Sequence, residues 1–165
     1  MHSELCLSIP TREQLATWRT FLTCSFALID ILDAELRAEC DLTLRWYDVL
    51  VQLEEGERPL RMNELASRIL ASKSGLTRVI DRMEEAGLVR RVRPENDRRT
   101  ILIVLTDKGT ETMERARRHH RDGIERHFSQ HLSDTDIKAL TRALEKISTH
   151  ARPLRPGRIR SGATS

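Results

Sequence analysis

The chain has 165 residues, enough for one domain with a core of its own. Hydrophobic residues make up 39% and charged residues 32% of the chain, a balance that fits a soluble, mainly helical protein. No uninterrupted apolar run reaches the length of a membrane span, and the N-terminal segment MHSELCLSIP lacks the long apolar stretch of a secretory signal. The three cysteines, with no CxxC pair, indicate a reducing compartment, so we expect a cytoplasmic protein without a membrane partner.

The net charge of +3 is unevenly distributed along the chain. Residues 58–99 hold eleven Lys or Arg against six Asp or Glu, and residues 152–165 add four Arg and no acidic residue. The remainder of the chain is therefore acidic. Such basic segments can be simple solvated faces, but in residues 58–99 the charge coincides with a predicted hairpin, which favours a polyanionic partner.

The N-terminal part predicts a short arm followed by one long helix. Thr11-x-x-Gln14 has the pattern of a capping box, which begins a helix that we expect to end near Cys40. Apolar residues repeat along it at a spacing of three or four: Leu15, Trp18, Leu22, Ile29, Leu32 and Leu36. This seam is longer than a small domain's own core needs, so we expect part of it to form a dimer interface.

A second helix is expected to begin at Asp41 and Thr43 and to run through Leu53. Residues 59–61 then predict a short strand, and residues 62–70 predict the first helix of a pair. The second helix of the pair should begin at Ser72, a good N-cap, and end at Gly87, which can adopt the left-handed conformation of a C-cap.

That second helix has two distinct faces. Leu76, Val79, Ile80 and Met83 follow the spacing of an apolar stripe that faces a core. The opposite face is polar and basic, with Lys73, Ser74, Thr77, Arg78 and Arg82. This division is typical of a helix that presents one side to a core and the other to a charged partner.

After Gly87 the pattern changes to that of a hairpin. Val89 and Val92 lie among three arginines, residues 94–97 have the composition of a turn, and residues 101–105 predict the return strand. A helix-turn-helix followed by a basic hairpin is a winged helix-turn-helix. In this architecture the second helix enters a major groove and the hairpin lies beside the backbone or the minor groove.

The C-terminal part predicts two more helices. Thr106 caps one that should run to about Gln130, and Ser133-x-x-Asp136 caps the last one. The last helix repeats Ile137, Leu140, Leu144 and Ile147, again a seam. We therefore predict a mainly α protein with a small β-wing, divided as follows: arm and first dimerisation helix, 1–40; winged helix-turn-helix domain, 41–106; C-terminal dimerisation helices, 107–151; disordered basic tail, 152–165.

The chain also resembles the MarR family of bacterial transcription regulators. The residues from Asn63 to Gly109 carry this resemblance, which covers roughly residues 12–150. The most specific motifs are Asp97-x-Arg99 in the wing, Leu105-Thr106-x-x-Gly109 after it, and the stretch from Asp81-Arg82-Met83 to Gly87-Leu88-Val89. The resemblance implies a homodimer that binds pseudo-palindromic DNA and often releases it on binding a small molecule. We predict that the protein represses transcription by occupying an operator.

These expectations assign DNA contacts to individual residues. Arg78 and Lys73 are expected at guanine edges, and Ser72, Ser74 and Thr77 at phosphates or base edges. Arg99 should enter the minor groove with its guanidinium held by Asp97. The remaining wing arginines should contact phosphates: Arg90, Arg91, Arg93 and Arg98. Arg82 is either a DNA contact or an ion-pair partner of Asp81 or Glu85.

For a small-molecule effector the candidate residues are aromatic and polar side chains of the first two helices: Trp18, Arg19, Phe26, Trp46, Tyr47 and Asp48. The same residues can equally belong to a core or an interface. Trp18 and Asp48 resemble the urate-responsive branch of the family, but that branch has arginines where this chain has Glu55 and Val79, which argues against urate.

Three further readings remain open. Cys6, Cys24 or Cys40 could sense oxidants, although Cys is often a small buried hydrophobe. His120, His127 and His131 could bind a metal, since residues four apart share a helix face, although no second set of ligands is evident. A winged helix can also serve protein assembly alone, which the arginine-rich wing argues against. No phosphate-binding loop, metal triad or nucleophile elbow is present, so we expect neither an enzyme nor a cofactor.

Overall fold

The computed structural model describes residues 9–56, 59–69, 75–94, 96–97 and 99–150. It divides into two compact units, residues 1–128 and residues 129–165, which are described separately below. The predicted basic tail, residues 152–165, lies outside the described residues, as does Cys6.

The first unit begins with α1 (Arg12–Cys40), as predicted from its capping box. The Thr11 hydroxyl accepts a hydrogen bond from the Gln14 backbone N–H, and the Gln14 side chain accepts one from the Thr11 N–H. Asp41 does not begin the next helix as predicted: it ends α1 in the left-handed conformation, at φ +51°. Thr43 alone caps α2 (Leu44–Glu54).

α1 is the one helix in the described part of the chain that is long and apolar enough, by length and composition, to cross a membrane. This corrects the expectation that no segment reaches that threshold. A single such helix is by itself weak evidence for a membrane. The expectation missed α1 because it considered uninterrupted apolar runs, whereas isolated polar residues interrupt this helix without making it polar overall.

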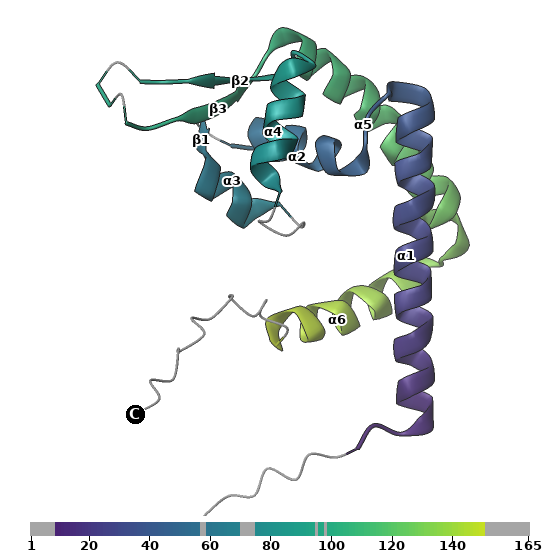
Figure 1. Ribbon diagram of the computed structural model, residues 1–165. Coiled ribbons are helices and arrows are strands. Elements are labelled where there is room, and N and C mark those ends of the chain that lie inside the picture. The colour runs from purple at the N-terminus through teal and green to yellow at the C-terminus, as the bar shows by residue number, and fades with distance from the viewer. Residues whose placement is uncertain (1–8, 57–58, 70–74, 95, 98, 151–165) are drawn as a thin grey trace, which may run out of the picture. The chain divides into compact units, whose positions relative to one another are not determined.

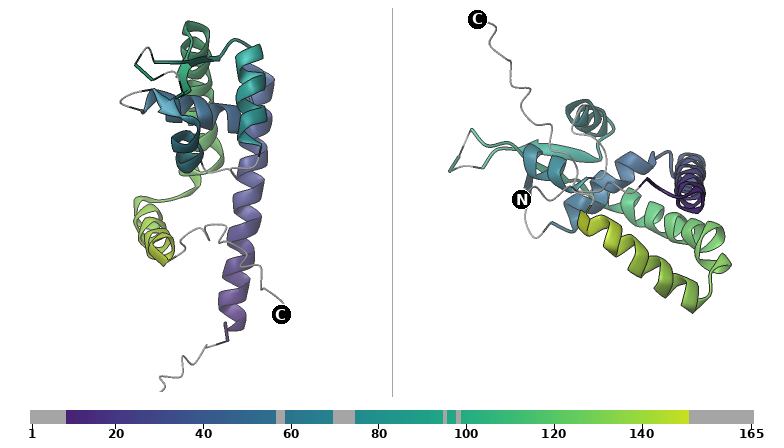
Figure 2. Two further views of the ribbon diagram at one scale, coloured as in Figure 1. Left: turned by 60° about the vertical axis from the view of Figure 1, so that its left-hand side comes forward. Right: turned by 90° about the horizontal axis from the view of Figure 1, so that it is seen from below.

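A small domain follows α2. Strand β1 (Leu60–Arg61) leads into α3 (Met62–Arg68), and α4 (Leu76–Glu85) precedes the hairpin of β2 (Val89–Val92) and β3 (Leu102–Leu105). The sheet is antiparallel with the order β1-β3-β2, which confirms residues 60–61 as its third strand. Val89 lies opposite Leu105 and Val92 opposite Leu102. Because β3 lies between β1 and β2, β2 is an edge strand of the described sheet. Figures 1 and 2 show the hairpin reaching out beyond α3 and α4.

Helix α5 (Asp107–His127) returns from the wing and packs along α1 (Figure 1). Gly123 lies at this contact, where a Cβ atom would meet the side chains of Glu35 and Leu32, both at 2.7 Å. Glu35 of α1 also pairs with Arg126 at 3.2 Å and lies 2.8 Å from His127 Nε2. The hydrogen bond from His127 lowers the pKa of Glu35, and the charge of Arg126 adds to this effect against the opposing effect of burial.

One hydrophobic core joins these elements, which is why the wing and the end of α1 form one unit. Its fully buried side chains come from every helix of the unit and from all three strands: Leu36, Leu42, Val49, Leu50, Leu60, Leu65, Ile80, Met83, Val89, Ile103 and Met113. Burial of such side chains is the main favourable contribution to folding, at roughly 1.5–3 kcal/mol for each.

The second unit contains a short 3-10 helix, Ser129–His131, and α6 (Asp134–His150). The predicted cap of α6 is confirmed, since Ser133 N–H donates to Asp136 Oδ2 at 3.0 Å and the Asp136 N–H donates to Ser133 Oγ at 3.3 Å. Leu144 and Ile147 of the predicted seam are exposed on α6.

Candidate nucleic-acid interface

Helix α4 has the two faces that the sequence predicted. Leu76, Ile80 and Met83 are buried, whereas Thr77, Arg78 and Arg82 are exposed. Its beginning differs from the prediction, because α4 starts at Leu76 and its N-cap residue is Gly75 at φ +87°. A residue in that conformation cannot lie inside a helix, so a helix capped at Ser72 cannot continue through Gly75. Ser72, Lys73 and Ser74 lie outside the described residues.

The C-terminal end of α4 is fixed to the start of α5. Gly87 takes the predicted left-handed conformation, at φ +73°, and the Leu88 N–H donates to the Met83 carbonyl at 2.9 Å, as in a Schellman motif. Thr106 Oγ1 donates to the Gly87 carbonyl at 2.6 Å, and Lys108 Nζ donates to the Ala86 carbonyl at 2.8 Å. These bonds hold the last turn of α4 where the chain enters β2.

The wing turn is organised by Asp97. Asp97 Oδ2 accepts from the Thr100 hydroxyl at 2.5 Å and Oδ1 accepts from the Arg99 backbone N–H at 3.1 Å. In the described structure the Asp97 carboxylate thus binds its own turn, and its hold on the Arg99 guanidinium at DNA stays a prediction. The hydrogen bond from Thr100, followed by that from Arg99, lowers the pKa of Asp97, so the carboxylate stays ionised.

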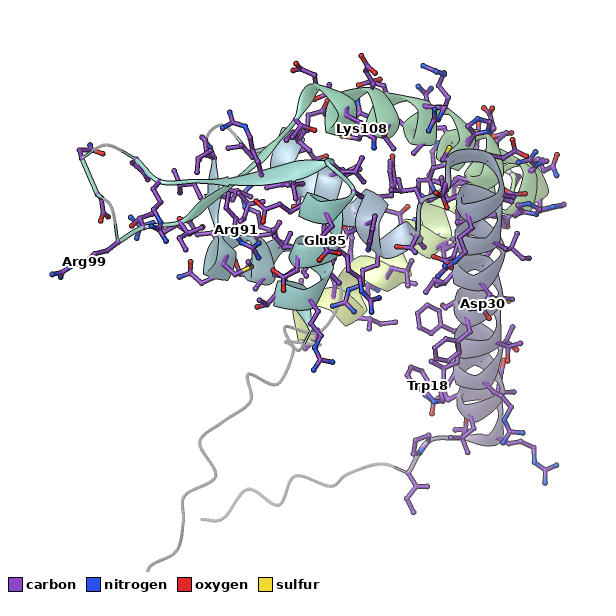
Figure 3. The ribbon with its side chains drawn as sticks, turned by 45° about the horizontal axis from the view of Figure 1, so that its top comes forward. Trp18, Asp30, Glu85, Arg91, Arg99 and Lys108 are labelled. Carbon is purple, nitrogen blue, oxygen red and sulfur yellow. The ribbon has the colours of Figure 1, made fainter. Side chains whose placement is uncertain are left out.

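Arg99 itself is exposed and extends from the tip of the wing (Figure 3). Arg90 and Arg93 are also exposed, whereas Arg98 lies outside the described residues. The exposed arginines of β2, the wing tip and α4 together give this unit a basic surface. A surface of this kind suits the phosphates of a nucleic acid.

Arg91 is the exception among the wing arginines, since its guanidinium is directed at α4 (Figure 3). Nη2 lies 2.5 Å from Asp81 Oδ1, and Nη1 pairs with Glu84. Burial lowers the pKa of Arg91, but the hydrogen bonds to Asp81 and Glu84 outweigh it and raise the pKa overall. Arg82, the other candidate partner of Asp81, is exposed.

The six residues predicted for an effector are not brought together within this chain. Trp18 and Phe26 are exposed on α1, at 56% and 62%, and Arg19 is exposed beside them. Tyr47 is buried against the ring of His120, with centroids 4.9 Å apart, and burial raises its pKa. Asp48 is half-buried on α2, and Trp46 lines a cavity.

That cavity, of about 400 Å³, lies between the end of α1, the start of α2, the α4–β2 turn and α5. Its lining combines apolar side chains with three cations: Arg37, Cys40, Asp41, Leu42, Thr43, Trp46, Ala86, Leu88, Lys108, Thr112 and Arg115. Sequence reasoning missed it because most of these residues come from helix ends that meet only in the folded chain. Cys40 to Thr43, which join α1 to α2, are the one stretch of consecutive residues in this lining.

The cysteines and histidines occupy separate environments. Cys24 is exposed on α1, and Cys40 is buried at the cavity. The predicted pairing of His127 and His131 on one helix face is wrong, because α5 ends at His127 and His131 belongs to the following 3-10 helix. In the described ranges, no three His, Cys, Asp or Glu side chains form a group that could hold a metal ion.

The fold and the basic face define a winged helix-turn-helix DNA-binding regulator, and comparisons with known proteins agree. The model of the MarR family matches residues 41–100. The crystal structure of AbsC, a MarR family transcriptional regulator from Streptomyces coelicolor, is 39% identical with a TM-score of 0.78, over 87% of this chain and 97% of that chain. Sco3205 of the same organism, solved in complex with DNA, is 29% identical with a TM-score of 0.80, over 88% and 96% of the two chains.

A curated relative agrees with these two structures. An HTH-type transcriptional regulator of Bacillus anthracis is 30% identical over 111 residues, which are 67% of this chain and 73% of the relative. The chain belongs to the MarR family of DNA-binding transcriptional regulators. It is therefore a regulator and not an enzyme.

Proposed function

We propose that the protein is a homodimeric repressor that occupies a pseudo-palindromic operator and leaves it when a small molecule binds. The observation that carries this proposal is the division of α4 into a buried apolar face and an exposed face with Thr77, Arg78 and Arg82. An exposed basic helix beside a basic hairpin matches the two grooves of a duplex. Such a regulator works where the chromosome is, so we place it in the cytoplasm.

The contacts divide between two grooves. Arg78 reads a guanine edge from the major groove, with Thr77 at a phosphate or base edge, and Arg99 enters the minor groove. Arg90 and Arg93 neutralise phosphates along the wing. Ser72, Lys73, Ser74 and Arg98 belong to the same proposed surface although they lie outside the described residues.

Exposed apolar side chains on α1 support the homodimer. Trp18 projects from α1 (Figure 3), and Phe26 and Ile29 are likewise exposed, Ile29 at 51%. Large exposed apolar patches on a helix are typical of an interface. α6 adds its own exposed Leu144 and Ile147. We assign residues 1–40 and 107–151 to dimerisation and residues 41–106 to DNA, so that two winged domains read half-sites about one helical turn apart.

The cavity beside the α4–β2 turn supports release by an effector. Its volume of about 400 Å³ lies in the range of about 300–1,000 Å³ that small-molecule sites occupy. Lys108 lines the cavity and also holds the carbonyl of Ala86 at the end of α4. A ligand that draws Lys108 away therefore favours positions of α4 that do not fit the operator, which is a shift in the population of conformations. Other residues of the predicted effector set, such as Trp18, would have to meet across the dimer.

The test is fluorescence anisotropy on the duplex upstream of this protein's own gene, with excess nonspecific competitor. Wild type should bind, Arg78→Ala should weaken binding by about 1–3 kcal/mol, and Arg118→Ala, an exposed arginine of α5, should not. Equal binding by wild type, Arg78→Ala and Arg118→Ala would reject α4 as the helix that contacts the bases. Peroxide-treated protein is compared in the same assay: release that a thiol reverses would favour the cysteine alternative over a small-molecule effector.

A further inference from the structure

We propose that Arg91 is a positioning residue whose guanidinium locks the wing onto the recognition helix α4, and that it does not contact a DNA phosphate. Two carboxylates of α4, Asp81 and Glu84, receive the two ends of one guanidinium that comes from β2. The inference rests on the proposed function, in which α4 and the wing engage one operator together.

Both terminal nitrogens of the Arg91 guanidinium are bound to carboxylates of α4. Nη2 lies 2.5 Å from Asp81 Oδ1, and Nη1 pairs with Glu84 Oε2. The backbone N–H of Arg91 donates to the second oxygen of Glu84, Oε1, at 2.8 Å. The Glu84 carboxylate therefore binds both the side chain and the backbone N–H of Arg91. A guanidinium held in this way has to give up two charged hydrogen bonds before it can reach a phosphate.

The sequence explains why the bridge forms at this place. Asp81 and Glu84 are three residues apart, so they share one side of α4. Alternation along β2 sends Arg90 and Arg91 to opposite faces of the sheet, and Arg90 is the exposed one. β2 is an edge strand of the described sheet, and Glu84 accepts from an N–H on that strand's open side.

The bridge has a mechanical consequence for DNA binding. Residues 86–88 connect α4 to β2, and the hydrogen bonds of Leu88, Thr106 and Lys108 hold only this end of the hairpin. Arg91 adds a second attachment several residues along β2, so that α4 and the wing move as one body. A rigid pair of reading elements loses less entropy when both grooves are engaged at once.

A positioning role and a phosphate contact predict different effects on operator affinity. The salt dependence of binding and the charge of the substituted side chain distinguish the two roles. Loss of a phosphate contact lowers the steepness of the salt dependence by about one, whereas loss of a positioning residue weakens binding with the steepness unchanged. Lysine replaces arginine at a phosphate, but it cannot reproduce a fork between two carboxylates. If Glu84 had no role in holding the wing, its removal should strengthen binding to the negatively charged DNA. If Glu84 holds the wing through Arg91, its removal should weaken binding.

The experiment measures operator affinity across a range of salt for wild type, Arg91→Lys, Arg91→Ala and Glu84→Gln, with Arg90→Ala and Arg90→Lys as matched controls. We expect Arg91→Lys and Glu84→Gln each to weaken binding about tenfold, within the usual range for residues in one network. The salt dependence should stay as steep as in wild type. Arg90→Ala should lower that steepness by about one, and Arg90→Lys should restore it.

A double variant tests whether the two residues act together: Arg91→Ala combined with Glu84→Gln should lose no more than Arg91→Ala alone, because the partner of Glu84 is already absent. The proposal is overturned if Arg91→Lys binds like wild type while Arg91→Ala lowers the steepness, or if Glu84→Gln binds more tightly. Glu84→Gln and Arg91→Lys are mild changes, so the comparison survives even if Arg91→Ala does not fold.

A second measurement does not require DNA. Amide hydrogen exchange of Arg91 should be slow in wild type and faster in Glu84→Ala, because that variant has no side-chain oxygen to accept the N–H. If the wild type fails to bind any operator, the proposed function fails, while slow exchange still supports the bridge and equal exchange in both variants overturns it.

Discussion

Thr106 and Gly87 are joined by a hydrogen bond of 2.6 Å, from the hydroxyl of the first to the carbonyl of the second. The same hydroxyl accepts from the Gly109 N–H at 3.0 Å and so caps α5. One side chain thus links the end of α4 to the start of α5, the helix that runs back along α1. Lys108 Nζ, bound to the Ala86 carbonyl at 2.8 Å, joins the same two helices a second time.

Thr106→Val should therefore destabilise the protein by about 1–2 kcal/mol, the usual cost of losing an N-cap, because it removes both bonds while keeping the shape. Thr106→Ser keeps the hydroxyl and should behave like wild type. Urea denaturation with an unchanged m-value measures the difference. Equal midpoints for the valine and serine variants would show that the hydroxyl contributes nothing.

Gly109→Ala tests the close approach of α5 to the backbone of Leu88. A Cβ atom at this position would lie 2.0 Å from the Leu88 carbonyl oxygen, which belongs to the backbone and cannot rotate away. The better helix propensity of alanine is worth about 1 kcal/mol. We expect overpacking to exceed it and to give a net destabilisation of about 1–3 kcal/mol.

Gly123→Ala is the comparison for that variant, measured by the same urea unfolding. Its Cβ would meet the ends of the Leu32 and Glu35 side chains, which can rotate. We expect a smaller loss than at Gly109. The reverse order would contradict the view that the backbone contact with Leu88 fixes the start of α5.

The stability contributed by Glu35 should depend on pH. The pKa of Glu35 is lowered in the folded chain by the hydrogen bond from His127, so ionisation of Glu35 favours the folded state. This contribution is fully present above the unfolded pKa of about 4.3 and is lost as the pH falls through the folded pKa. Thermal unfolding of Glu35→Gln should show a deficit relative to wild type near neutral pH that closes as the pH falls below about 4.

Glu39→Gln, an exposed position one turn further along α1, serves as the control for this experiment. Its difference from wild type should change little over the same range. A deficit of Glu35→Gln that is the same at both ends of the range would mean that the contact with His127 and Arg126 does not depend on the charge of Glu35.

Arg99→Ala should weaken operator binding by roughly 1–3 kcal/mol, the worth of a specific arginine contact, and leave the dimer intact. Arg99 is exposed at the wing tip, so its removal disturbs no packing. Anisotropy measures the affinity and sedimentation measures the dimer. Arg121→Ala, which removes an equal charge from α5, controls for the change in net charge; unchanged affinity in Arg99→Ala would reject the wing as a DNA contact.

Trp18→Ser tests the homodimer. Trp18 is 56% exposed in the single chain, and its ring lies 6.0 Å from that of Phe21. If a partner copy covers this face, the variant should dissociate at protein concentrations where wild type is dimeric, with helical content retained. Thr23→Ser, at an exposed polar position of the same helix, should not change the sedimentation. A dimer as stable as that of wild type would place the interface elsewhere.

Local sequence determined much of this protein. The capping boxes at Thr11 and Ser133, the left-handed turn at Gly87, the amphipathic pattern of α4 and the three strands of the wing all follow from residues close together in the chain. Each depends on the conformational preferences of a few neighbours, and those preferences do not need the rest of the fold. The family resemblance, carried by the same stretch, was likewise confirmed.

Tertiary structure decided which partner each charged or polar side chain has. Arg91 had Asp81 and Glu84 within reach only after β2 folded back along α4. The cavity around Cys40 and Lys108 also exists only where α1, α2 and α5 meet the α4–β2 turn. A sequence shows which groups can pair, but the choice among several possible partners depends on distances that only packing sets.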